Sequence, residues 1–179
     1  INGATRNGSC AVRRVPLYFG EKLMRVFQVT ADGGSRGNPG PAAYGATISE
    51  NGKVIAELHE FIGTATNNVA EYSGLIAALH YINKLDPGAQ IEVAMDSKLV
   101  IEQMSGRWQI KNEGMRALAK DARNAHDPKL ITYRWIPREE NSHADRLANK
   151  ALDERVDGYQ PQVPANRLTA RLREKEVPT

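Results

Sequence analysis

Four acidic residues stand at positions where a purely structural role explains them poorly. Asp32 and Asp96 each come at the end of a predicted strand, and Asp145 opens the last predicted helix. Glu71 lies early in another predicted helix, and apolar residues continue its face at helical spacing, so its carboxylate should face the sheet. Ligands of open α/β sheets bind in the crevice beside the ends of the strands. We therefore expect the four carboxylates to converge on one site.

Each of these acids has a simpler explanation when it is taken alone. Asp32 precedes two glycines and is a common type of turn residue. Glu71 can complete a capping box with Asn68, and Asp96 and Asp145 both suit the positive N-terminus of a helix. Taken together these explanations fail, because four carboxylates at one edge of a sheet repel one another unless cations neutralise them.

The chemistry of the four side chains predicts which cation they bind. Carboxylate oxygens are hard ligands, which favour Mg²⁺ or Mn²⁺ over zinc. The chain has one cysteine, Cys10, so neither an internal disulfide nor a cysteine-rich metal cluster can form. Several carboxylates can hold two divalent ions about 3.5–4 Å apart, an arrangement that serves in-line attack on phosphodiesters. The residues therefore predict a two-metal phosphodiester site.

Sequence periodicity places these acids in an α/β fold. Strands are predicted at 25–32, 43–49, 53–62, 90–96 and 130–136, and helices at 69–85, 97–104, 112–125 and 142–153. Asn51-Gly52 is a strong hairpin signal, and the Gly- and Pro-rich segment 33–41 is predicted to be a turn. Three consecutive strands followed by alternating helices and strands predict a mixed sheet flanked by helices. The last two strands, which are joined through helices, should be parallel.

Composition and charge divide the chain into a centre and two ends. The 179 residues suffice for one domain, and no apolar run approaches the length of a membrane span. Residues 1–23 carry a net charge of +3 and residues 155–179 carry +2, whereas 24–154 hold fifteen bases and seventeen acids, a net −2. We expect 24–154 to be the domain and 155–179 a tail or linker. Residues 1–23 are expected to be a disordered or non-native extension, with a native tail and a targeting peptide as alternatives.

Four local sequences resemble the active-site motifs of type 1 ribonuclease H. They are residues 32–45, 66–72, 95–97 and 141–149, and they contain the four acids in the order found in that family. The resemblance covers about 25–153. The Arg-Glu-Glu-Asn segment that ends at Asn141 is similar to the bacterial and archaeal branch. Actinobacterial members of that branch often continue into a phosphatase domain, which would make the C-terminal tail the start of a linker.

The resemblance implies a fold and an activity. The fold is the ribonuclease H-like five-stranded mixed sheet, with three antiparallel strands followed by two parallel ones. The activity is hydrolysis of the RNA strand of RNA–DNA hybrids, which leaves 5′-phosphate and 3′-hydroxyl ends. Asp32 would bridge two Mg²⁺ ions, Asp145 would help to hold the ion that activates water, and Glu71 and Asp96 would hold the other. Mn²⁺ is an alternative ion. We also expect a cytoplasmic monomer that binds the hybrid, without a membrane attachment or an obligate protein partner.

The resemblance also implies a set of substrate contacts, namely Asn38, Thr66, Asn67, Asn68, Lys98 and Arg138. The asparagines and the lysine would contact 2′-hydroxyls, the group that separates RNA from DNA, and the threonine would contact a phosphate of the DNA strand. Arg138 stands where many members carry a mobile-loop histidine and is expected to replace it. The asparagines also suit turns and a helix cap, and His143 is expected to be a structural residue in the first turn of its helix.

Two other functions stay open on the sequence alone. The first is a module of the same fold that binds hybrids without cutting them, although the complete set of four acids argues against it. The second is another nuclease of the wider ribonuclease H-like superfamily that acts on DNA or on junctions. Cleavage of a panel of nucleic acids separates these possibilities.

Overall fold

The computed structural model describes residues 18–19 and 22–156 of the chain. A five-stranded sheet has the order β5-β4-β3-β6-β7. Its strands are β3 Val26–Ser35, β4 Gly40–Glu50, β5 Lys53–Ala65, β6 Gln90–Met95 and β7 Ile131–Trp135. The pairs β3–β4 and β4–β5 are antiparallel, whereas β6 runs parallel to both β3 and β7. The predicted mixed sheet is therefore confirmed, including its two parallel strands.

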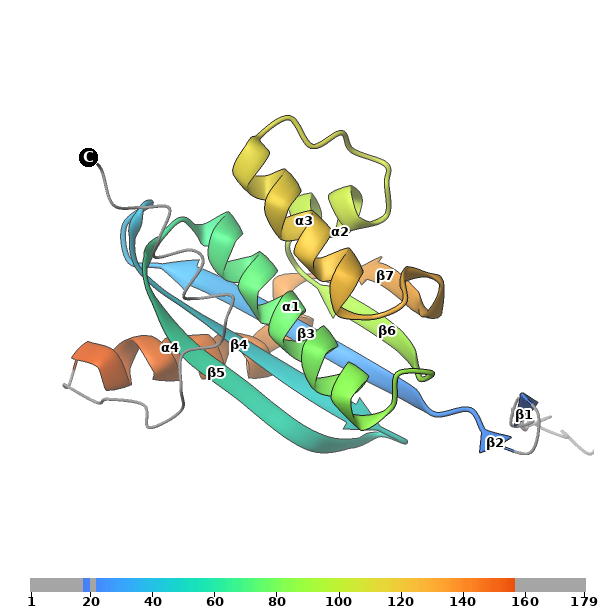
Figure 1. The fold of residues 1–179 in the computed structure, drawn as a ribbon. Helices are drawn as coiled ribbons and strands as arrows, with labels where there is room; N and C mark the ends of the chain where they lie inside the picture. Colours follow the sequence, from blue (N-terminus) through green and yellow to red (C-terminus); the bar gives the residue numbers. More distant parts are fainter. Residues whose placement is uncertain (1–17, 20–21, 157–179) are drawn as a thin grey trace, which may run out of the picture.

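Helices cover both faces of this sheet. They are α1 Asn67–Leu85, α2 Lys98–Met104, α3 Glu113–Ala125 and α4 Ser142–Val156, with short 3₁₀ turns η1 at Pro128–Leu130 and η2 at Arg138–Asn141. Figure 1 shows α1, α2 and α3 in front of the sheet and α4 behind it. On β4, Tyr44 packs with residues of α1, whereas Gly45 faces the backbone of α4. Each face of the sheet therefore has its own apolar layer.

The alternation along β3 explains which way its acid faces. Phe27, Val29 and Ala31 are fully buried in the main core together with residues of α1. Because side chains of a strand alternate between the two faces, Asp32 lies on the opposite face, where α4 packs against β3. The same pattern that builds the core thus directs one acid toward the helix that carries Asp145.

The turn predicted at 33–41 is shorter in the structure, because β3 continues through Ser35. Gly33 and Gly34 pair with Tyr44 and Ala43 of β4. A Cβ on Gly33 would lie 2.2 Å from a backbone carbon of α1, so this glycine permits a close approach of strand and helix. The prediction failed because the contact that requires glycine comes from a helix distant in sequence.

The start of α1 also differs from the prediction. Thr66 caps the helix, and its hydroxyl accepts a hydrogen bond from the Val69 N–H at 3.4 Å. Asn68 is already helical, so it does not cap α1, and the alternative explanation of Glu71 as half of a capping box with Asn68 is wrong. At the other end of the domain, α4 continues to Val156, past the predicted ends at 153 for the helix and 154 for the domain.

The N-terminal segment contains a feature that the sequence analysis did not predict. Tyr18–Phe19 (β1) and Lys22–Leu23 (β2) pair as two short antiparallel strands. Aromatic residues favour strands, which fits the two aromatic residues of β1. The expectations for residues 1–17, 20–21 and 157–179 concern parts of the chain outside the described residues.

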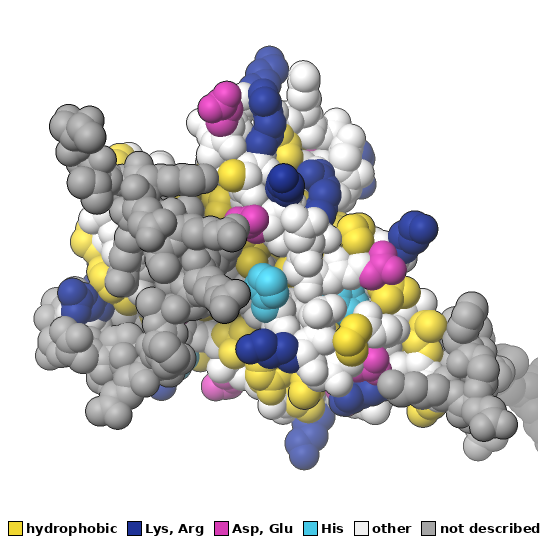
Figure 2. Space-filling view, viewed as in Figure 1, with side chains coloured by type: hydrophobic (Ala, Val, Ile, Leu, Met, Phe, Trp, Pro, Cys, Tyr) yellow, Lys and Arg dark blue, Asp and Glu magenta, His cyan; other side chains and the backbone are white. Residues whose placement is uncertain are grey.

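The surface of the described residues agrees with their near-neutral charge. On the face in Figure 2, Lys and Arg side chains are scattered among acidic and apolar ones. Among the described residues, no helix is both long and apolar enough to cross a membrane.

Candidate active site

The four predicted acids lie together in one pocket with a volume of about 390 Å³. Asp32 belongs to β3, Asp96 directly follows β6, Glu71 lies early in α1, and Asp145 lies in the first turn of α4. Four elements therefore each contribute one carboxylate. The expected convergence of the four carboxylates on one site is therefore confirmed.

Asp32 is the electrostatic centre of this group. Burial raises its pKa to about 7, and the negative charges of Asp96, Asp145 and Glu71 act in the same direction. One hydrogen bond opposes them, since the Gly33 N–H donates to Asp32 Oδ1 at 2.9 Å. A carboxylate that holds its proton near neutrality is one for which the surrounding protein supplies too little positive charge.

Glu71 is held by a residue that the sequence analysis did not single out. The Ser97 hydroxyl donates to Glu71 Oε2 at 2.6 Å and accepts from the Val100 N–H, which caps α2. Burial raises the pKa of Glu71 to about 7, with the Ser97 hydrogen bond acting against this and the Asp96 charge reinforcing it. Ser97 thus ties the acid of α1 to the start of α2.

Asp96 is fixed by two further residues without a predicted role. Asn141 is only 1% exposed, and its side-chain amide donates to Asp96 Oδ1 at 2.6 Å and to the Ala31 carbonyl at 2.9 Å. The indole N–H of Trp135 donates to the Asp96 carbonyl at 3.1 Å. One amide therefore links the strand that carries Asp32 to the neighbouring acid.

Arg138 lies at the mouth of the pocket, beside Asp145. Its Nη2 is 3.7 Å from Asp145 Oδ1, and its side chain is 80% exposed. An exposed pair at this distance contributes little to stability, so the arginine is free to exchange this partner for another anion. Arg138 therefore adds an exposed positive charge to the wall of the pocket that holds the four acids.

Three of the predicted substrate residues lie where the β3–β4 turn meets the start of α1. Asn38 Oδ1 accepts from the Asn67 N–H at 3.2 Å, and Asn67 Oδ1 accepts from the Ser35 N–H at 2.8 Å. These bonds tie the β3–β4 turn to the start of α1, where Thr66 serves as the cap. The structural roles expected for Asn38 and Asn67 are therefore present, and only Asn67 of this group lines the pocket.

The other two substrate residues and the motif histidine lie elsewhere. Asn68 is in the first turn of α1, and Lys98 is an exposed residue at the first position of α2. His143 lies in the first turn of α4, and its Nε2 is 2.6 Å from Oε1 of Glu57 on β5. The structural role expected for His143 fits this contact between helix and strand.

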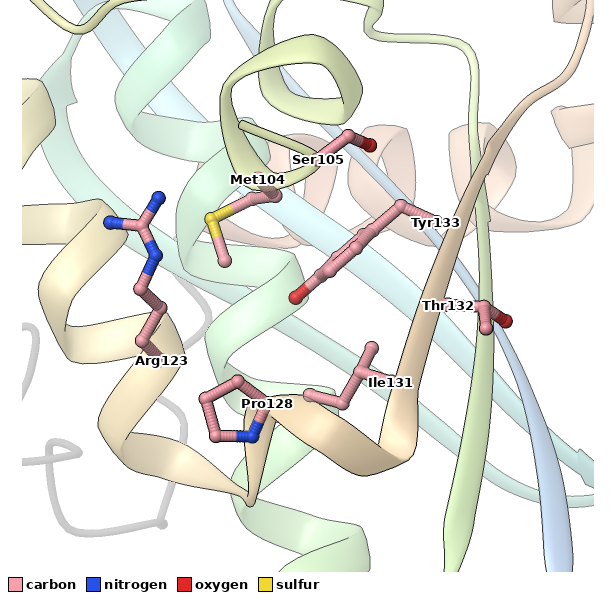
Figure 3. Close-up of a pocket in the computed structure, with 7 residues that line it drawn as sticks. All are labelled: Met104, Ser105, Arg123, Pro128, Ile131, Thr132 and Tyr133. Carbon is pink, nitrogen blue, oxygen red and sulfur yellow. The ribbon is translucent and has the colours of Figure 1, made fainter. Parts of the chain in front are cut away.

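A second pocket, of about 340 Å³, lies between α2, α3 and β7. Figure 3 shows Tyr133 pointing its hydroxyl into this space, with Met104 and Arg123 on the opposite wall. Its lining is Met104, Ser105, Arg123, Pro128, Ile131, Thr132 and Tyr133. It contains none of the four acids, so the pocket around Asp32 is the candidate active site.

The donor set of that site fits divalent cations. All four candidate ligands are carboxylates, and two of them have raised pKa values that a nearby cation would lower again. Among the described residues, no three Asp, Glu, His or Cys side chains are close enough to enclose a single ion. Mg²⁺ usually keeps several waters and also binds substrate phosphates, so it does not require such a cage of side chains.

Comparison with known proteins identifies the family. The family described as reverse transcriptase-like matches residues 30–151. A protein of Hydrogenovibrio crunogenus named ribonuclease H is 33% identical over 147 residues, which cover 73% of this chain and 98% of that protein. The chain belongs to the ribonuclease H family. Its mixed sheet and the place of the four acids agree with the fold expected from the motifs.

Comparisons with two further proteins show that the chain belongs to the type 1 branch of the ribonuclease H family. The bifunctional protein Rv2228c of Mycobacterium tuberculosis is 52% identical over 128 residues, and the chain spans only 35% of its length. The structure of its N-terminal RNase H domain is 47% identical, with a TM-score of 0.71, and covers 76% of this chain and 99% of that one. LC11-RNase H1, solved in complex with RNA/DNA hybrid, is 34% identical, with a TM-score of 0.68 and coverages of 73% and 99%.

Proposed function

We propose that the chain is an endonuclease that hydrolyses the RNA strand of RNA–DNA hybrids and leaves 5′-phosphate and 3′-hydroxyl ends. The observation that carries the proposal is the convergence of four carboxylates from four elements in one pocket. There, burial and the neighbouring charges raise the pKa of Asp32 to about 7. The family relative solved with an RNA/DNA hybrid supports the substrate class. Residues 24–154 would form the catalytic unit.

The four carboxylates would hold two Mg²⁺ ions, with Mn²⁺ as an alternative. Asp32 would be shared by both ions, Asp145 would serve one of them, and Glu71 and Asp96 would serve the other. Bound ions would supply charge neutralisation and Lewis acidity for the attack of water on phosphorus and for departure of the 3′-oxygen.

The chain's own residues prepare the pocket for this reaction. Asn141 holds Asp96 at the end of β6, and Ser97 holds Glu71 on α1, so both carboxylates are oriented before substrate binds. Such preorganisation lowers the cost of reaching the reactive geometry. Arg138 can leave Asp145 for a product phosphate, which would assist its departure.

Strand selection would come from the residues beside the pocket. Asn38, Asn67 and Asn68, together with Lys98, would contact 2′-hydroxyls of the RNA strand, and Thr66 would contact a phosphate of the DNA strand. The hydrogen bonds of Asn38 and Asn67 hold both amides at the junction of the β3–β4 turn and α1, and Asn67 also lines the pocket that contains the acids.

We place the enzyme in the cytoplasm, because RNA–DNA hybrids form where DNA is replicated and transcribed, and we propose that it acts as a monomer. Cell fractionation and light scattering of the purified protein test these two statements. Enrichment in a membrane fraction or a dimeric mass would contradict them.

A strand-labelled substrate panel tests the proposed activity. Hybrid, duplex DNA, duplex RNA and both single strands are incubated with the protein in Mg²⁺, in Mn²⁺ and in excess chelator. The proposal predicts cleavage of the RNA strand of the hybrid alone, abolished by the chelator. Hybrid binding without cleavage in any metal would indicate a binding module, and cleavage of duplex DNA would indicate another nuclease of the superfamily.

A further inference from the structure

The active-site pocket extends beyond the four acids along α4. Its wall includes Arg36, from the turn between β3 and β4, and Asn149 and Leu152 from the later turns of α4. Arg36 and Arg138 are the two cationic side chains among the residues that line it. Arg36 has no role in the function proposed above, although it stands between two residues that do, Asp32 and Asn38.

Arg36 makes an exposed ion pair that links the β3–β4 turn to α4. Its Nη2 contacts Oδ1 of Asp153, which lies eight residues after Asp145 on α4 and therefore about 12 Å further along the helix axis. The two side chains are 45% and 62% exposed. Exposed pairs of this kind contribute at most about 1 kcal/mol to stability. The pair therefore holds the guanidinium in place at little cost and releases it easily.

The electrostatics of the pocket favour a phosphate as the alternative partner. Any strand that is cut here must bring its backbone past four carboxylates, and 24–154 as a whole is net acidic. A guanidinium binds phosphate oxygens through two parallel hydrogen bonds, and Asp153 presents a carboxylate of similar geometry. The carboxylate is thus positioned as an internal substitute for a backbone phosphate.

We propose that Arg36 binds a phosphate of the RNA strand next to the scissile one, and that it exchanges Asp153 for this phosphate when the hybrid enters. The inference rests on the proposed function, because the strand that reaches Arg36 is the one held at the four acids. It adds a subsite between the β3–β4 turn and the later turns of α4.

Steady-state cleavage of the hybrid by three variants tests the exchange. Arg36→Gln should raise KM about tenfold, because it removes one charged hydrogen bond to the substrate, and should leave kcat within twofold of wild type. It should also reduce the slope of log(kcat/KM) against log salt by about one. Asp153→Asn removes the competitor and should lower KM. Arg25→Gln is the matched control, since Arg25 pairs with Glu50 at 2.8 Å and lies outside the pocket, and its kinetics should equal those of wild type.

The strand is tested with hybrids that carry one neutral methylphosphonate linkage at a time. One linkage beside the cleavage position of the RNA strand should raise KM for wild type and produce no further rise for Arg36→Gln. Unchanged KM and salt slope in Arg36→Gln, or coupling to a linkage of the DNA strand, would overturn the inference while wild type still cuts the hybrid. If wild type does not cut the hybrid, the proposed function fails first. Thermal unfolding of each variant verifies that it is folded.

Discussion

Replacing Asp32 with asparagine should stabilise the metal-free protein at alkaline pH. The pKa of Asp32 rises from 3.8 to about 7 in the folded state, mainly through burial and the charge of Asp96. Each pKa unit corresponds to about 1.4 kcal/mol, so ionisation of the Asp32 carboxylate lowers the free energy of unfolding by up to about 4 kcal/mol. Solvent that reaches the pocket and protonation of the neighbouring acids both reduce this loss, so we expect a difference of about 2 kcal/mol in the free energy of unfolding between Asp32→Asn and wild type.

The raised pKa of Asp32 sets the pH range over which wild-type stability changes. Between about pH 4 and pH 7 the unfolded chain has released the Asp32 proton and the folded protein retains it, so wild-type stability falls as the pH rises. Above about pH 7 both states are ionised and the loss is complete. The neutral amide of Asp32→Asn avoids this loss, so its stability advantage over wild type should be full at pH 8 and about two fifths of that at pH 5.

Thermal unfolding in excess chelator measures this difference. At pH 8 the midpoint of Asp32→Asn should exceed that of wild type by about 5–8 °C, from about 3 °C per kcal/mol for a domain of this size. Glu92→Gln is the control, because Glu92 is exposed on β6 and outside the pocket, and its midpoint should match wild type. A variant that is less stable than wild type at pH 8, or an equal difference at both pH values, would refute the reasoning.

Three further predictions follow from the packing and charge of the site. Gly33→Ala should lower the free energy of unfolding in urea by about 3 kcal/mol, because the new Cβ would collide with the backbone of α1. A Cβ at Gly34 has open space, so Gly34→Ala should be much less destabilising, and equal losses in the two variants would contradict this. Asn141→Ala should lower the free energy of unfolding by about 2 kcal/mol and lower kcat at least tenfold, since the Ala31 carbonyl and the Asp96 carboxylate lose their donor; an unchanged kcat would remove Asn141 from the mechanism. Saturating Mg²⁺ should raise the free energy of unfolding of wild type at pH 8 by about 2.7 kcal/mol at a hundred times Kd, and raise that of Asp32→Asn much less. Calorimetric titration of Mg²⁺ checks this ordering, and equal affinities would argue against metal binding by Asp32.

Local signals predicted most of the fold. Asn51 and Gly52 adopt positive φ values of 53° and 77°, as the hairpin signal required. The alternation of Phe27, Val29 and Ala31 correctly placed Asp32 on a strand. These features depend on neighbours in sequence, so a single chain displays them directly.

The errors and omissions concern contacts between distant residues. Glycine at position 33 indicated a turn, and its actual role is to let α1 approach β3. Asn68 was a good cap by residue type, but the cap is Thr66, two residues earlier, at the junction where Asn67 reaches Ser35. Asn141 bonds acceptors 110 and 45 residues away, and no local pattern encodes such a link.

Cleavage of a hybrid labelled on each strand, by wild type, Asp32→Asn and Glu92→Gln in Mg²⁺, tests the central claim most directly. The four carboxylates that share the pocket are predicted to act as one metal-dependent unit. Wild type and Glu92→Gln should cut only the RNA strand and leave 5′-phosphate ends, and Asp32→Asn should bind hybrid while cutting it at least a thousandfold more slowly, about 4 kcal/mol in the barrier. Undiminished cleavage by Asp32→Asn, or cleavage by wild type in excess chelator, would contradict the account.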